Sequence, residues 1–210
     1  MNILIIGATG GTGRELVQQA LDLGHSVIAL VRKPGKMKIT HERLSILQGD
    51  VLEYESVASS VKNADAVLSA LGHKRWFIKS SILSGGTKNI IKAMKENNIK
   101  RFVCETSLGI GDSWGKLGLY YTFFVIPVIV FFYFLDKGKQ ERAIMESDLD
   151  WIIVRPGQLT NGRKRGVYRH GLNIGSYVRT VSISRADTAE FMLKQLTDDT
   201  YVRKTPGVAY

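Results

Sequence analysis

The chain has 210 residues, of which 44% are hydrophobic and 23% charged, with only four prolines. This size and composition predict one globular domain with a substantial core, and they exclude a disordered tail protein and a collagen-like fibre. The single cysteine, Cys104, excludes a disulfide framework, and the four histidines have no ligand spacing, so no metal site is expected. The chain begins without the basic segment and long apolar core of a secretory signal, which favours a cytoplasmic protein.

The charge balance is strongly positive, since 29 lysines and arginines face 19 acidic residues and give a net charge of +10. Such a surplus can attract nucleic acid, an anionic membrane or a small polyanionic cofactor. Residues 66–95 and 151–186 contain basic residues and no acidic one. These two stretches predict a positive face. No nucleic-acid-binding motif accompanies them, so a nucleic-acid partner is not expected.

The first thirty residues predict a strand, a glycine loop, a helix and a second strand. Ile3–Ile6 is a short, β-branched apolar run, and Gly7–Gly13 interrupts it. Apolar residues then recur at helical spacing from Leu16 to Leu23, and Val27–Val31 reads as a second buried strand. This is a βαβ unit of the usual length.

The same alternation continues along the chain. Further strands are expected at residues 44–47, 66–69, 102–105 and 151–154, and helices at 53–61, 80–97 and near 137–147. Alternation of this kind predicts an α/β protein with a Rossmann-like, doubly wound parallel sheet. No repeat or linker divides the chain, so residues 1–210 are expected to form a single domain whose C-terminal portion contributes to the substrate site.

Residues 117–135 carry no charge, and this run is about as long as a membrane-spanning helix needs. Pro127 interrupts it, Gly118 and Tyr120–Thr122 weaken its first half, and it lies within an α/β pattern. A stable membrane span is therefore not expected. The alternatives are a surface that lies in a membrane interface, binds a partner or forms a homodimer, a lid over a substrate, or a buried helix.

The loop from Gly7 to Gly13 has the pattern G-x-x-G-x-x-G between a strand and a helix. The first glycine permits a tight turn, the second allows a pyrophosphate to approach the backbone, and the third allows the helix to pack on the strand. Phosphates then lie at a helix N-terminus, which favours an anion. The alternative is a simple turn. The expected cofactor contacts here are Gly7, Thr9, Gly10, Gly11, Thr12 and Gly13.

Arg32 follows the second strand, where a carboxylate would favour NAD and an arginine favours the 2′-phosphate of NADP. A guanidinium can pair bidentately with a phosphate. The sequence therefore favours NADPH over NADH. The alternative is a solvated basic loop that Lys33, Lys36 and Lys38 continue.

Four motifs together resemble the atypical short-chain dehydrogenase/reductase family, and most of all its NAD(P)H-binding branch of flavin reductases and biliverdin-IXβ reductases. They are Gly7-Ala8-Thr9-Gly10-Gly11-Thr12-Gly13, Val31-Arg32-Lys33-Pro34, Gly49-Asp50-Val51 and residues 147–157, from Ser147-Asp148-Leu149 to Arg155-Pro156-Gly157. The resemblance implies further cofactor contacts near the adenine, beneath the cofactor and beside the nicotinamide. These are Asp50, Val51, Ala70, Leu71, Gly72, Thr106 and Pro156.

The family at large uses a tyrosine, a lysine four residues later and a serine, and Tyr133, Lys137 and Ser107 fit that pattern as candidate catalytic residues. The i, i+4 spacing puts the phenol and the ammonium on one face of a helix, and a nearby cation lowers a phenol's pKa. The flavin- and bilin-reductase branch does not rely on this pair. Protonation of the acceptor by solvent therefore remains an alternative.

The expected function is hydride transfer from NADPH to a planar small-molecule acceptor such as a flavin, a bilin or a quinone. The alternative is a redox sensor that binds dinucleotide without turnover. Aromatic side chains are candidates for the walls of the acceptor site, and basic side chains are candidates to meet its anionic groups. They are Trp76, Phe77, Trp114, Tyr120 and Tyr121, with His73, Lys74 and Arg75.

Overall fold

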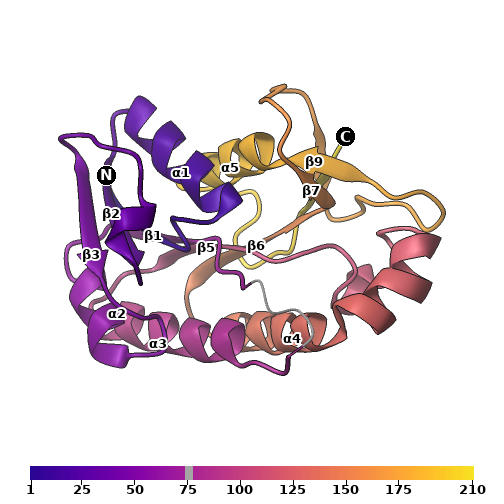
Figure 1. Ribbon diagram of the computed structural model, residues 1–210, viewed down its shortest axis with the longest axis horizontal. Helices are drawn as coiled ribbons and strands as arrows, with labels where there is room; N and C mark the ends of the chain where they lie inside the picture. The colour runs from indigo at the N-terminus through magenta and orange to yellow at the C-terminus, as the bar shows by residue number, and fades with distance from the viewer. Residues whose placement is uncertain (74–77) are drawn as a thin grey trace.

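The computed structural model describes residues 1–73 and 78–210, and its centre is a twisted, mostly parallel sheet between two layers of helices (Figure 1). In these residues the main sheet has the order β3-β2-β1-β4-β5-β6-β10-β8, and only β8 runs antiparallel to its neighbour. The predicted single-domain, Rossmann-like, doubly wound fold is confirmed. Four of the predicted residues, Lys74, Arg75, Trp76 and Phe77, lie outside the described residues.

The strands of the first half form where the sequence predicts them, because each contains a short run of apolar, often β-branched residues. The inner strands are largely buried, whereas β3 at the sheet edge is half-buried or exposed. The strands of the main sheet are β1 (Asn2–Ile6), β2 (Ser26–Val31), β3 (Leu44–Gln48), β4 (Ala66–Ser69), β5 (Arg101–Glu105), β6 (Asp150–Pro156), β8 (Arg169–Gly171) and β10 (Gly207–Ala209). A separate pair consists of β7 (Gln158–Thr160) and β9 (Ser182–Ser184).

Helices cover both faces of the sheet (Figure 1). One face carries α1 (Gly11–Asp22) and α5 (Arg185–Lys194), and the Gln19 side chain of α1 donates to the Ala186 carbonyl of α5 at 2.9 Å. The other face carries α2 (Tyr54–Val61), α3 (Ile82–Glu96) and α4 (Phe131–Met145). Each layer closes its own hydrophobic core against the sheet.

Strand order reverses beside β1, which pairs with β2 on one side and with β4 on the other. Open α/β sheets bind ligands beyond the carboxyl ends of the strands at such a point, which here means beyond the ends of β1 and β4. The glycine loop follows β1, and residues Ala70–Gly72 follow β4. The fold therefore brings together the segments that the sequence assigned to one site.

The C-terminal elements β7 to β10 and α5 were not predicted, because the strands are only three residues long. Ser184 caps α5 by accepting the Asp187 amide at 3.0 Å. Burial alone would raise the pKa of Asp187, but hydrogen bonds from Tyr210, Gly166, Ser184 and Arg165 outweigh it and hold that pKa below its ordinary value. The Tyr210 hydroxyl donates to Asp187 at 2.5 Å and so ties the last residue of the chain to α5.

Two predictions about helices were wrong in detail. Helix α4 begins at Phe131, six residues before the predicted start. The sequence did not indicate this start because residues 131–135 are apolar on every side and show no amphipathic period. Leu23 was counted with the buried face of the first helix, but it lies just beyond the last helical residue of α1 and is exposed.

Residues 117–135 form a lobe at one end of the molecule, which we call the apolar lobe (right side of Figure 1). It contains a π-helical segment, η3 (Tyr121–Ile129), and the start of α4, with a bend of 97° between them. The interpretation as a buried helix was wrong, because eight large side chains of the lobe are exposed. They are Leu119, Tyr120, Phe123, Phe124, Val128, Phe131, Phe132 and Leu135.

In residues 1–73 and 78–210 no single helix is both long and apolar enough to cross a membrane. The bent pair of η3 and α4 meets the length and composition required only when the two are taken together.

Candidate functional site

The glycine loop between β1 and α1 is shaped by backbone contacts that leave no room for side chains at two positions. Gly7 has φ +80°, and a Cβ there would lie 2.4 Å from the carbonyl oxygen of Ala70. A Cβ at Gly13 would lie 2.1 Å from the Gly7 carbonyl oxygen. Gly10 has an ordinary φ of −73°, and a Cβ there would make one tight contact, 3.1 Å from the Gly7 carbonyl oxygen, so the fold excludes a side chain far less strongly there than at Gly7 or Gly13. The glycine that the fold needs least is the one expected to make room for a ligand.

The N-terminus of α1 opens onto this loop without a competing side chain. Its N-cap is Gly10, no side chain accepts from the first amides, and the first turn contains no acidic residue. The amides and the helix dipole therefore favour an anion at this point. The loop could hold the pyrophosphate of a dinucleotide.

Arg185, the first residue of α5, lies against this loop and was not predicted as a site residue. Its Cδ and Nε atoms are 2.4 and 2.5 Å from where a Cβ on Gly11 would lie, and its guanidinium donates to Asn161 at 2.7 Å. The sequence shows only an arginine after a helix cap, and nothing local connects that arginine with a loop some 170 residues earlier. A guanidinium beside the loop adds positive charge where phosphates are expected.

The predicted adenine side of the site lies at the ends of β2 and β3. Arg32 follows β2 and is exposed. Asp50 is half-buried and accepts the Leu52 amide at 3.0 Å, and Val51 is buried against Gly86, where a Cβ would come within 2.7 Å of it. These contacts fix the turn after β3, while within residues 1–73 and 78–210 the Arg32 guanidinium makes no hydrogen bond or ion pair.

Tyr133 projects from α4 toward the segment after β4. Its hydroxyl is 3.4 Å from the position that a Cβ on Gly72 would occupy. The His73 ring packs edge-on against the Tyr133 ring at 5.1 Å between centroids. The carboxyl end of β4 and this phenol are therefore adjacent, at the point where the strand order reverses.

Lys137 lies one turn after Tyr133 and is buried. Its Nζ is 5.3 Å from the centre of the Tyr133 ring and donates to the Glu105 carbonyl at 3.3 Å. Burial opposes the charged form, but the acidic groups of Tyr133, Cys104, Glu105 and Glu141 outweigh it and hold the pKa of Lys137 above its ordinary value. The lysine is therefore a fixed cation behind the tyrosine ring.

Glu105 ends β5 beneath the same site. It accepts the Thr12 hydroxyl at 3.0 Å, so the Thr12 side chain points inward, away from a ligand on the loop. Burial raises the pKa of Glu105, although Lys137, Thr12 and Arg185 favour its charged form. Glu105 thus joins the helix that carries the loop to the strand beneath the tyrosine and lysine.

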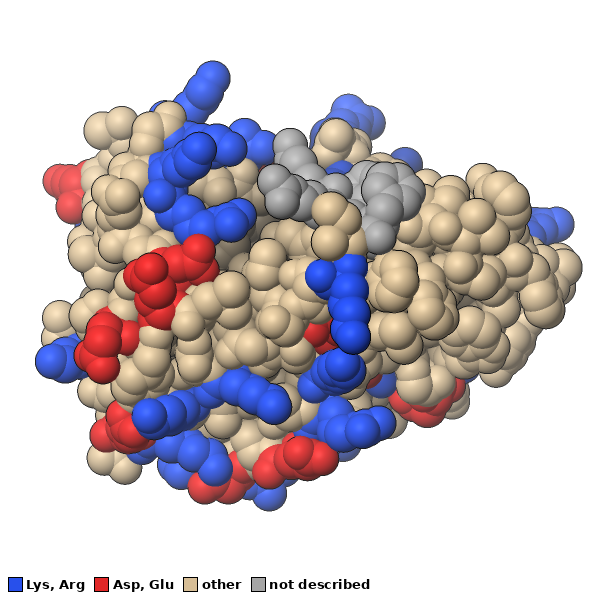
Figure 2. Space-filling view, turned by 60° about the horizontal axis from the view of Figure 1, so that its bottom comes forward, with Lys and Arg blue, Asp and Glu red and all other residues tan. Residues whose placement is uncertain are grey.

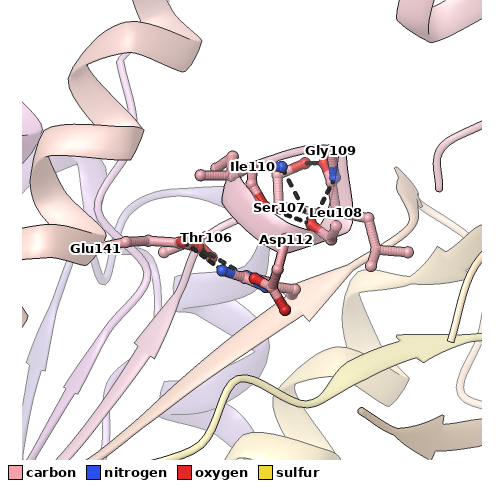
Figure 3. A network of polar contacts seen from close by, with 9 residues as sticks. Thr106, Ser107, Leu108, Gly109, Ile110, Asp112 and Glu141 are labelled. Atoms are coloured by element: carbon pink, nitrogen blue, oxygen red, sulfur yellow. Dashed lines mark hydrogen bonds and ion pairs between the residues drawn. The ribbon is translucent and has the colours of Figure 1, made fainter. Parts of the chain in front are cut away.

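A second buried network holds the segment after β5 in place (Figure 3). The Arg155 guanidinium pairs with both oxygens of Glu141, from Nε to Oε1 at 3.0 Å and from Nη2 to Oε2 at 2.7 Å, and all these groups are buried. Thr106 donates to Glu141 at 2.6 Å, so its hydroxyl is directed into the network. Arg155 also donates to the exposed Asp112 at 2.6 Å.

Ser107 is half-buried and donates to the Leu108 carbonyl at 2.8 Å. The buried Pro156 ends β6, and its carbonyl accepts the Leu108 amide at 3.0 Å. Ser107 and Pro156 therefore share one layer at the carboxyl edge of the sheet.

Two of the aromatic residues expected at the acceptor site, Trp114 and Tyr120, are exposed, and Tyr120 stacks on Phe124 within the apolar lobe.

Comparison with known proteins agrees with this geometry. The model of the NAD(P)H-binding family matches residues 7–199, which is most of the chain. The chain belongs to this family. Among curated relatives, the photosystem II assembly factor Ycf39 of Synechocystis is 26% identical over 98% of the chain and 61% of its own length. The chain thus spans about three fifths of that longer relative.

Solved structures of the same architecture cover the whole chain. ChuY from Escherichia coli O157:H7, an anaerobilin reductase, superposes with a TM-score of 0.82 at 22% identity and covers 100% of this chain and 97% of its own. A short-chain dehydrogenase/reductase from Veillonella parvula in complex with NADP has a TM-score of 0.81 at 20% identity, with coverages of 100% and 94%. At these identities the likeness shows the fold.

Membership of the NAD(P)H-binding family makes the cofactor class clear, and the residues present fit it, since the glycine loop leads to an N-terminus of α1 that has neither a side-chain cap nor an acidic residue in its first turn. Within the residues that the structure describes, no three His, Cys, Asp or Glu side chains are placed to hold a metal ion.

Proposed function

We propose that this protein is an NADPH-dependent reductase that transfers a hydride to a planar acceptor, of which flavins, bilins and quinones are the classes to test. The observation that carries the proposal is the position of the Tyr133 hydroxyl. It lies beside Gly72, where the strand order reverses, and the buried Lys137 lies behind its ring. A chain that only bound dinucleotide would need the glycine loop but no phenol and buried ammonium beside it.

The cofactor would be held by the glycine loop, by the turn of Asp50 and Val51, and by residues Ala70–Gly72. When bound, a reduced nicotinamide supplies a hydride. Arg32 is exposed at the end of β2 and is proposed to meet a 2′-phosphate, which gives the preference for NADPH. Arg185 is proposed to neutralise the pyrophosphate at the start of α1.

Tyr133 is proposed to supply the proton that accompanies the hydride. The buried ammonium of Lys137 lies behind the Tyr133 ring, near the negative charge that the departing proton leaves, and solvent then returns a proton to the phenol. The tertiary placement of Tyr133 supports this role over direct protonation by solvent, which the resemblance to the flavin- and bilin-reductase branch favours slightly. Ser107 is the third member of the proposed set, at the end of the neighbouring strand.

The acceptor class is supported by the placement of Tyr133 and by a solved structure of the same architecture. A planar, conjugated acceptor can stack on a nicotinamide and needs few polar groups from the protein. One solved structure of this architecture is an anaerobilin reductase, which acts on a molecule of that kind.

The decisive experiment is NADPH oxidation, followed by absorbance, with a panel of free flavin, a quinone and biliverdin. Reduction of one acceptor class supports the reductase. Tight NADPH binding with no acceptor reduced across the panel would favour the alternative, a redox sensor without turnover.

The role of the phenol is tested by Tyr133→Phe, with Tyr54→Phe as the matched control, since Tyr54 is half-buried at the start of α2 and its hydroxyl donates to Glu96. Positioned acid catalysis contributes typically 10²- to 10⁴-fold, so kcat should fall at least about a hundredfold with NADPH affinity unchanged. A kcat within a few-fold of wild type would show that solvent protonates the acceptor and that Tyr133 only shapes the site.

A further inference from the structure

The apolar lobe is a surface that hydride transfer does not explain. Phe123 is 74% exposed and Val128 64%, and both project from η3 at the end of the molecule. Figure 2 shows the lobe on the right as a continuous surface mostly without charged side chains. Monomeric soluble proteins rarely expose contiguous apolar patches of this extent without a function.

The backbone of the lobe is bent and convex. Such a shape fits a deformable surface better than the fixed surface of a folded protein. The 97° bend at Val130 places η3 and the first turns of α4 at a corner. A second copy of the chain would have to offer a matching apolar hollow. A hollow of about 330 Å³ at the base of the lobe is lined by Phe132 and Leu135, but also by the cations of Lys79 and Lys139. An apolar lobe seated there would have to cover these charges, which costs desolvation free energy.

Basic side chains border the lobe at both of its ends. Lys79, which precedes α3, and Lys139, within α4, line the hollow at the base of the lobe. Within the part of the chain that the structure describes, neither makes an ion pair. The acid in the same hollow, Asp136, is buried and already accepts the Leu83 and Ser84 amides.

At the other end, the segment of Tyr177, Val178 and Arg179 packs beside the start of the lobe. The Leu119 amide donates to the Val178 carbonyl at 3.4 Å, and a Cβ on Gly118 would lie 2.6 Å from the Arg179 backbone. Tyr177 and Val178 are exposed and extend the apolar surface, and Arg179 is exposed beside them. Lys79 and Arg179 lie in the two acid-free stretches of the sequence, residues 66–95 and 151–186, and Lys139 comes from α4.

Apolar and aromatic side chains on a convex lobe match the acyl chains of a membrane surface, and the cations around the lobe match its anionic headgroups. Aromatic residues enter the boundary between headgroups and acyl chains, while lysines and arginines stay at the level of the anionic headgroups. We propose that the apolar lobe docks the protein peripherally on an anionic lipid bilayer, with Lys79, Lys139 and Arg179 at the headgroups. This proposal does not depend on the reductase activity, because its readout is lipid binding.

The test is co-sedimentation of the full chain with vesicles of phosphatidylcholine alone and of phosphatidylcholine mixed with phosphatidylglycerol. We expect binding to the anionic vesicles, weaker binding to the neutral ones, and release by high salt, which screens the headgroup charges. Phe123→Asp should lower the partition to anionic vesicles at least about tenfold, because it places a carboxylate where a ring would enter the interface. The matched control is Leu23→Asp on the distant end of α1, where the native side chain is 64% exposed.

The charge contribution is tested with Lys79→Gln/Lys139→Gln, which should lower binding to anionic vesicles at least about tenfold and leave binding to neutral vesicles unchanged. Lys62→Gln/Lys100→Gln removes two exposed charges at the opposite edge of the sheet and should have little effect. All four variants change exposed side chains, and circular dichroism checks that each is folded.

Two results would overturn the proposal. One is the absence of binding to anionic vesicles, or binding that Phe123→Asp does not weaken. The other is a wild-type dimer in light scattering that Phe123→Asp converts to a monomer, since the lobe would then be the contact of the predicted homodimer.

Discussion

Replacing Glu141 by glutamine should destabilise the fold far more than the loss of a surface charge, although the side chain keeps its size. Glu141 is buried and accepts three hydrogen bonds, two from Arg155 and one from Thr106 (Figure 3). The amide of glutamine retains only one oxygen, so its NH₂ group would face a guanidinium or hydroxyl that also donates. Arg155 would then remain charged and buried, and among the described residues the exposed Asp112 would be its one acidic partner.

The magnitude follows from this burial. Removing one partner of a buried ion pair typically costs about 3 to 5 kcal/mol, because the remaining charge is uncompensated. For a chain of 210 residues this corresponds to a fall in Tm of roughly 6 to 20 °C. Asp112→Asn provides the matched control. Its carboxylate binds the same guanidinium but is 72% exposed, and exposed pairs contribute about 0 to 1 kcal/mol.

Urea denaturation followed by circular dichroism measures both variants, with the slope checked for two-state behaviour. The double variant Arg155→Met/Glu141→Leu completes the comparison, since an apolar pair of similar volume should recover most of the loss. A Glu141→Gln variant within about 1 kcal/mol of wild type would refute the reasoning, because the network would then not depend on the charge of Glu141.

Three further changes test the cofactor site and the C-terminal closure. Arg32→Ala should weaken NADPH binding about ten- to a hundredfold and leave NADH binding little changed, because a charge-assisted hydrogen bond contributes roughly 1.5 to 3 kcal/mol. Fluorescence titration measures both affinities, and equal losses would indicate that Arg32 has a structural role. Gly10→Val should abolish dinucleotide binding, because its side chain would occupy the space of the phosphates. The Tm should stay near wild type, because among the described residues a Cβ there meets one atom, the Gly7 carbonyl oxygen at 3.1 Å. Retained affinity would mean that the phosphates lie elsewhere. Asp187 has a pKa below its unfolded value of about 3.9, so its contribution to stability is present above that pH and lost as pH falls through the folded pKa. Stability measured against pH should therefore fall less steeply below about pH 4 in Asp187→Asn, and an unchanged slope would contradict this account.

Much of the cofactor site could be predicted from the sequence because its signals are local. The β1 strand, the glycine loop and α1 follow one another within 22 residues, and each is marked by its own residue types. The spacing of Tyr133 and Lys137 puts both on one face of a helix, and the structure has them so. Strand positions were also largely predictable, since apolar runs that are buried on both faces differ plainly from the helices between them.

Only the tertiary structure decided which distant groups meet. Arg185 lies against Gly11, Thr106 meets Glu141, and Arg155 is fully buried, and no local pattern distinguishes these polar residues from solvated ones. The short strands β7 to β10 depend on pairing partners that are far away in sequence.

The apolar lobe shows the same limit most clearly. Residues 117–135 have the composition of a core helix, yet many of their side chains are exposed. Hydrophobicity reports the free energy that burial would release, but whether another surface is present to cover a segment depends on the packing of the whole chain.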